Sequence, residues 1–157
     1  MVKQPSRALR FPAGFTTVEM LVVVGVLLVL IAMAAPALSG MVVTQQLKNA
    51  SFDLSSSLNL ARSEALTRNA AVTIDPVAGD WARGWTVTEA GGTVLRRQSA
   101  YGRIALSGPV RVIYSADGRP DSVATPFAVT AVDANTDNYR CVRLRVNGRF
   151  NLKRGVC

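Results

Sequence analysis

The chain has 157 residues, of which 49% are apolar, and its formal net charge is +8. This length accommodates one domain of ordinary size and one additional segment, such as an anchor. The sequence lacks histidine, a glycine-rich phosphate loop and any acidic cluster with metal-ligand spacing. We therefore expect neither an enzyme nor a site for a metal or a cofactor.

The N-terminal part combines a basic leader with a long apolar run. Lys3, Arg7 and Arg10 precede the stretch 20–38, which contains no polar side chain. Residues 15–42 are enough to cross a hydrocarbon core of about 30 Å as a helix that rises about 1.5 Å per residue. The basic residues before this run predict a cytoplasmic N-terminus and a translocated remainder.

Two residues of this run have special physical consequences. Glu19 places a carboxylate just inside the apolar segment, where an unpaired acid costs about 2.5–3.5 kcal/mol on insertion scales. Such an acid requires a cation as its partner. Pro36 lies further along the expected helix, and proline inside a helix causes a kink.

The sequence Gly14-Phe15-Thr16-Thr17-Val18-Glu19 resembles the processing site of type IV prepilins and type II secretion pseudopilins. The resemblance implies that residues 1–14 are a leader, removed by a prepilin peptidase that also methylates the new N-terminal Phe15. It further implies that Glu19 meets the terminal amine of a neighbouring subunit. A subunit that carries both groups makes heterologous contacts, which build helical filaments.

Two other interpretations of the N-terminus stay open. The first is a conventional secretory signal cut after Ala34, because Ala32-Met33-Ala34 fits the small-x-small pattern. The second is an uncleaved anchor on an unrelated domain. The length of the apolar run and the position of Glu19 argue against the conventional signal.

Residues 43–69 continue the helix with an amphipathic pattern. Apolar residues recur every three or four positions, at Val43, Leu47, Ala50, Leu54, Leu58, Ala61 and Ala65. One helix over 15–69, roughly 80 Å long, therefore joins an apolar first half to an amphipathic second half. We expect Ser55-Ser56-Ser57 on its solvent-facing side.

Residues 70–157 predict a β-rich head. The expected strands are 71–74, 84–88, 93–97, 110–114, 127–132, 141–146 and 149–153. Turn signals separate them, among them Asp117-Gly118 and Asn147-Gly148. Antiparallel hairpins packed on one long helix give an α+β, pilin-like fold.

The head also resembles the GspH/FimT family of minor pilins and pseudopilins, which includes FimU-like subunits. The matching motifs are Ala61-Arg62-Ser63-Glu64-Ala65, Trp81-x-x-Gly84-Trp85, Asp117-Gly118-Arg119 and Asn147-Gly148-Arg149. We expect Trp85 in the core and both Gly-Arg pairs in turns.

Cys141 and Cys157 are the two cysteines of the chain. An even pair predicts a disulfide in an exported domain and two free thiols in a cytosolic one. Because the apolar run predicts export, we expect a disulfide between them.

From Arg140 onward the sequence is basic and has no acidic residue. A two-residue turn at Asn147-Gly148 would place Arg143 opposite Leu152 and mix apolar with basic side chains. A loop one residue longer would pair Val146 with Phe150, Leu144 with Leu152 and Arg143 with Lys153. We favour the longer loop because it separates the two kinds of side chain.

The basic residues have two interpretations, a solvated face that keeps the head soluble or a site for a polyanion such as DNA. The candidate DNA-binding residues are Arg143, Arg145, Arg149, Lys153 and Arg154. FimT-type members of the family bind DNA through a C-terminal Gly-Arg-x-Arg motif. Gly148-Arg149 matches the motif, whereas Asn151 occupies the position of its second arginine.

The resemblance favours a minor type IV pilin, a structural subunit that helps to initiate or cap pilus assembly. It implies a place in the bacterial inner membrane, a periplasmic head, and other pilin subunits as partners. The alternatives are a pilus-associated DNA receptor for natural transformation and a minor pseudopilin of type II secretion. A C-terminal disulfide favours the pilus, because it is more typical of pilins in this family.

Overall fold

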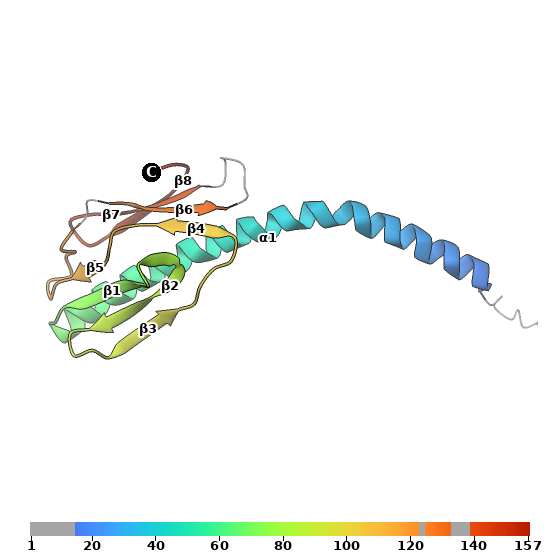
Figure 1. Ribbon diagram of the computed structural model, residues 1–157. Helices are drawn as coiled ribbons and strands as arrows, with labels where there is room; N and C mark the ends of the chain where they lie inside the picture. Colours follow the sequence, from blue (N-terminus) through green and yellow to red (C-terminus); the bar gives the residue numbers. More distant parts are fainter. Residues whose placement is uncertain (1–14, 123–124, 133–138) are drawn as a thin grey trace, which may run out of the picture. The chain divides into compact units, whose positions relative to one another are not determined.

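The computed structural model describes residues 15–122, 125–132 and 139–157, so the expected leader and Gly14 lie outside it. The described residues form one long helix followed by eight strands (Figure 1). The elements are α1 Thr17–Arg68, β1 Val72–Val77, β2 Asp80–Glu89, β3 Val94–Gln98, β4 Ile104–Ser107, β5 Val112–Tyr114, β6 Phe127–Ala131, β7 Arg140–Leu144 and β8 Phe150–Arg154. The α+β, pilin-like fold predicted from the sequence is confirmed.

The chain divides into two compact units after Leu38, and α1 contributes to both. In the first unit the hydroxyl of Thr16 caps the helix, because it accepts a hydrogen bond of 3.2 Å from the Glu19 N–H. Thr16 and Glu19 thus occupy the two positions of a capping-box sequence. The helix continues through Pro36, where the kink stays a prediction. Within the described ranges, no helix combines the length and the apolarity needed to cross a membrane.

In the second unit, the seven apolar residues predicted to share one face of α1 are all buried. Ser55 and Ser57 are buried as well, so the expectation that they lie on the surface was wrong. Each hydroxyl donates to the carbonyl four residues earlier, at Ser51 and Asp53 respectively. These bonds satisfy the donors, which removes most of the cost of burying them.

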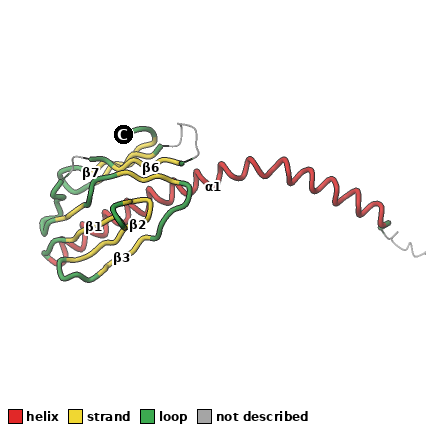
Figure 2. The backbone as a smooth tube through the Cα atoms, in the orientation of Figure 1, coloured by secondary structure: helices red, strands yellow, loops and turns green. Residues whose placement is uncertain are grey.

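In the described part of the head, the strands form two antiparallel four-stranded sheets, in the orders β3-β2-β1-β5 and β4-β6-β7-β8. Figure 2 shows the strands gathered along the second part of α1. Residues of α1 and of both sheets join in one hydrophobic core. The strand β4 was not predicted from the sequence. It has only four residues, which alternate between buried and exposed, and it pairs with β6.

Two tryptophans of β2 connect the sheets with the helix. Trp85 is fully buried, as predicted, and its Nε1 donates to the hydroxyl of Ser57 on α1 at 2.9 Å. Trp81 donates to the Pro109 carbonyl at 2.7 Å and meets the ring of Phe127 on β6 edge to face. Each indole therefore donates a hydrogen bond in addition to burying its apolar ring surface.

Two turns of the same design meet, and one of them is the loop that joins β7 to β8. In each, a glycine with a φ above +70°, Gly118 or Gly148, follows an Asp or Asn whose side chain accepts the next N–H but one. Arg62 of α1 donates to the Gly118 carbonyl at 3.1 Å. Tyr114 donates to the Gly148 carbonyl at 3.3 Å, and burial raises the pKa of its phenol, which keeps it a donor.

The register of β7 and β8 corrects the sequence prediction. Leu144 pairs with Phe150, and Arg143 pairs with Asn151. The loop has three residues, as favoured, but they are 146–148, because the Arg145 N–H donates to the Arg149 carbonyl and closes the turn. Val146 therefore leaves the strand. Basic and apolar side chains still separate, because the ladder moves by two residues, a full period of the strand.

The indole partner of Trp85 gives a first prediction. Ser57→Ala leaves a buried N–H without an acceptor, and we expect a loss of about 1–3 kcal/mol in the free energy of unfolding. Denaturant unfolding of the chain in detergent measures it. The control is Ser63→Ala on the exposed side of the same helix, expected within about 0.5 kcal/mol of the parent. Equal effects of the two changes would contradict the assigned role of Ser57.

The contact between the two turns gives a second prediction. A Cβ at Gly148 would lie 2.1 Å from the Gly118 carbonyl oxygen, whereas a Cβ at Gly79, with nearly the same φ, would meet nothing within 4 Å. Gly79→Ala adds only backbone strain, about 1–2 kcal/mol. We expect Gly148→Ala to cost at least about 1 kcal/mol more, because the turns must also separate. Denaturant unfolding of both variants compares the two costs, and equal costs would argue against the contact.

Candidate functional site on the C-terminal hairpin

The hairpin of β7 and β8 ends the second sheet, with β8 at its edge. Val142 and Leu144 point into the core, where they are buried. Alternation along the strands places Cys141 and Arg143 of β7 and Asn151 and Lys153 of β8 on the opposite, outer face. One face of the hairpin therefore packs on the core, and the other carries Arg143 and Lys153.

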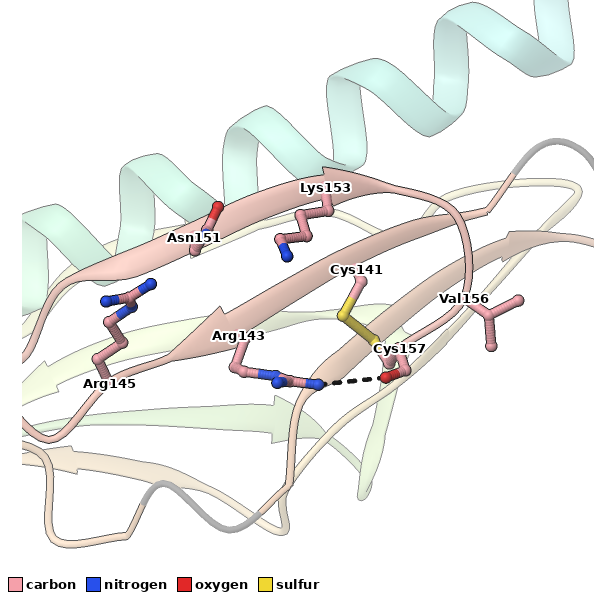
Figure 3. Close-up of a pocket in the computed structure, with 7 residues that line it drawn as sticks. All are labelled: Cys141, Arg143, Arg145, Asn151, Lys153, Val156 and Cys157. Carbon is pink, nitrogen blue, oxygen red and sulfur yellow. Dashed lines mark hydrogen bonds between the residues drawn. A yellow bond between two sulfur atoms is a disulfide. The ribbon is translucent and has the colours of Figure 1, made fainter.

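The predicted disulfide between Cys141 and Cys157 is present. It holds residues 155–157 against the outer face of β7, and the Gly155 N–H donates to the Tyr139 carbonyl at 2.9 Å. The guanidinium of Arg143 donates to the backbone oxygen of Cys157 at 3.2 Å. The last residues of the chain thus form a wall beside the basic face (Figure 3).

A cavity of about 170 Å³ lies between this wall and the hairpin. Its lining residues are Cys141, Arg143, Arg145, Asn151, Lys153, Val156 and Cys157 (Figure 3). The contribution of Val156 was missed in the sequence, because it depends on the disulfide that folds the end of the chain back over the sheet. Only its position between the two cysteines could have indicated it.

The five basic residues predicted as one cluster divide into separate groups. Arg143, Arg145 and Lys153 line the cavity, and Arg149 does not. Arg154 pairs with Arg140 in the register, so alternation places it on the other face of the hairpin. The structure therefore brings together three of the five candidates.

Among the residues that the structure describes, no acidic side chain pairs with the three cations of the cavity. Acids of the head pair elsewhere, for example Asp53 with Arg96 at 3.6 Å and Asp75 with Arg111 at 3.3 Å. In the described part of the chain, no group of three His, Cys, Asp or Glu side chains could hold a metal ion. The charged side chains that line the cavity are therefore all cationic.

The predicted assembly residues lie in the first unit. Phe15 is 75% exposed, and Glu19 is also exposed, with no ion-pair partner in the described segments. The side chain of Pro36 lies outside the described residues. The hairpin and the N-terminal residues belong to different units, so each is a separate candidate site.

The disulfide gives a prediction for the stability of the head. It closes a loop of 16 residues, which lowers the entropy of the unfolded chain and stabilises the head by about 3 kcal/mol. We expect reduction to lower the free energy of unfolding by about that amount, measured by denaturant unfolding with and without dithiothreitol. A Cys141→Ser/Cys157→Ser variant should no longer respond to the reductant. An unchanged unfolding curve of the parent chain would contradict this role.

One family model and two solved structures match the chain. The profile described as "Type II transport protein GspH" matches residues 50–149. Two crystal forms of the type IV minor pilin FimU of Pseudomonas aeruginosa share the fold, with TM-scores of 0.61 and 0.58 and 23% identity in both. The matches cover 69% and 68% of this chain and 89% and 91% of the FimU chains. Among curated protein sequences, none matches significantly.

The chain contains all the head motifs that suggested this family, and the structure uses them together. Arg62 and the glycines of the two turns join helix to sheet, and Trp81 and Trp85 join the sheets to the core. Because the matching profile spans more than half of the sequence, the chain belongs to the GspH family of minor pilins and pseudopilins, whose members are structural subunits.

Proposed function

We propose that the chain is a minor subunit of a type IV pilus that helps to initiate or cap assembly. The observation that carries the proposal is the surface of the first part of α1. Its large apolar side chains are exposed in the single chain, among them Leu21 at 73% and Met33 at 74%. An apolar surface of this extent requires a covering, which lipid supplies before assembly and neighbouring subunits supply afterwards.

The N-terminus supplies the polar part of the same interaction. A prepilin peptidase would cut after Gly14 and methylate Phe15, which creates a new amine a short distance before Glu19. The hydrogen bond from the Glu19 N–H to Thr16 supports a helix that begins directly behind this amine. The amine of one subunit would neutralise the Glu19 carboxylate of another, and this offset contact repeats along a filament.

The same proposal assigns a location to each remaining segment of the chain. Residues 15–42 would anchor the chain in the inner membrane with the N-terminus in the cytoplasm, and Pro36 would bend the helix. Residues 43–69 and 70–157 would form the periplasmic head. The Cys141–Cys157 disulfide supports this location, because disulfides persist in the oxidising periplasm.

A deletion separates the pilus from the type II secretion filament. Loss of the chain should reduce surface piliation and twitching motility in the organism that encodes it, while protein secretion continues at the parental level. Piliation is measured by immunoblot of sheared filaments, and secretion by the activity of exported enzymes in the medium. Loss of secretion with normal piliation would assign the chain to the pseudopilus.

The carboxylate of Glu19 gives the sharpest test of assembly. We expect Glu19→Gln to lower the amount of the chain in sheared filaments at least tenfold, because the buried amine of its neighbour loses its counter-ion. Glu64→Gln removes a carboxylate from an exposed ion pair on the same helix and should assemble normally. Equal incorporation of both variants, at equal amounts of chain in the cell, would overturn the electrostatic part of the proposal.

The geometry supports a DNA receptor less well. Binding along a nucleic acid draws on cations that follow successive phosphates. Here Arg143, Arg145 and Lys153 surround one cavity, whereas Arg154 falls on the other face of the hairpin. The position of the second arginine of the FimT motif is occupied by Asn151, an uncharged residue of the cavity.

A further inference from the structure

We propose that the cavity between the outer face of β7 and β8 and residues 155–157 binds one acidic side chain of a neighbouring filament subunit. The inference rests on the proposed function, because it requires an assembled partner. It concerns a surface of the head, separate from residues 15–42, which we propose as the anchor.

Three cationic side chains line the same cavity. Arg143, Arg145 and Lys153 line a single space of about 170 Å³, and their side chains lie along the same face of the hairpin (Figure 3). Like charges so arranged repel one another unless an anion lies between them. Among the described residues, no acidic side chain supplies such an anion, because their ion pairs lie elsewhere. An acidic side chain of another molecule can therefore serve as the counter-ion.

A disulfide and a hydrogen bond hold part of the cavity's lining in place. The disulfide fixes residues 155–157, and the backbone oxygen of Cys157 accepts a hydrogen bond from Arg143. This bond holds the guanidinium beside the cavity, so less side-chain entropy is lost when an anion binds. Asn151 adds an uncharged amide donor between the cations. A basic face that only interacts with water requires neither the disulfide nor the hydrogen bond of Arg143.

The shape of the cavity selects the class of partner. One small space lined by three cations fits one carboxylate, which accepts several charge-assisted hydrogen bonds. The wall also includes the disulfide and Val156, which is 83% exposed. A protein partner would cover Val156 while an acidic side chain of the partner enters the cavity. The charged backbone of a nucleic acid would leave Val156 exposed to water. The observations therefore favour an acidic residue on a protein surface.

Photocrosslinking at the wall tests the proposal in cells that assemble filaments. The full chain carries p-benzoylphenylalanine at position 156, in place of the exposed Val156. We expect an adduct with another subunit, and mass spectrometry should find Asp or Glu in or beside the crosslinked peptide. The absence of an adduct, when immunoblots show the chain in sheared filaments, would overturn the inference and leave the proposed function intact. Absence of the chain from the filaments would instead reject the proposed function, and the inference with it.

Two matched charge reversals test whether the cavity itself is responsible. Arg145→Glu/Lys153→Glu changes two cations of the cavity, and Arg149→Glu/Arg154→Glu changes two exposed cations outside it on the same hairpin. Both pairs alter the net charge equally. We expect the first pair to reduce the adduct at least fivefold and the second to change it less than twofold. Equal reductions would show diffuse attraction between charged surfaces and contradict a built site.

Two further arms complete the experiment. Cys157→Ser releases the wall and should reduce the adduct as the cavity pair does, so an unchanged adduct would contradict the role of the disulfide in shaping the site. The purified full chain in detergent is also mixed with duplex DNA at low salt. Retardation that disappears with the cavity pair and persists with the control pair would make the cavity a nucleic-acid site and overturn the inference.

Discussion

The head depends on the burial of one stripe of α1, from Val43 to Ala65, beneath two sheets. Both sheets pack against this helix, so its side chains form part of the core of each sheet. Directed contacts then fix the arrangement. Trp85 binds Ser57 near the middle of the stripe, and Arg62 binds the turn at Gly118 near its end. Without the stripe, both sheets would expose their apolar faces.

Periodicity allowed the helix and its buried stripe to be predicted, because a spacing of three to four residues is a local property of the sequence. The burial of Ser57 depends on Trp85, which is 28 residues away, and no local pattern reveals such a partner. The strand β4 is too short for a clear alternation. The hairpin register failed for another reason. Ladders two residues apart separate basic from apolar side chains equally well, and only the geometry of the turn at Gly148 distinguishes them.

The candidate site was predictable in composition but not in arrangement. Arginines and a lysine near the end of the chain were evident in the sequence, as was the pair of cysteines. Their combination into one cavity requires the disulfide to fold residues 155–157 back over β7. The same disulfide therefore stabilises the head and shapes its basic face. A filament subunit would thus present two recognition elements, an apolar helix with one acid and a cationic cavity on the head.

We propose that the chain becomes a filament subunit by processing at its N-terminus. Mass spectrometry of the mature chain, purified from the membranes or filaments of the organism that encodes it, determines its first residue. We expect a chain that begins at Phe15 with one methyl group on its amine. A mature chain that begins after Ala34, or one that retains the leader, would contradict it.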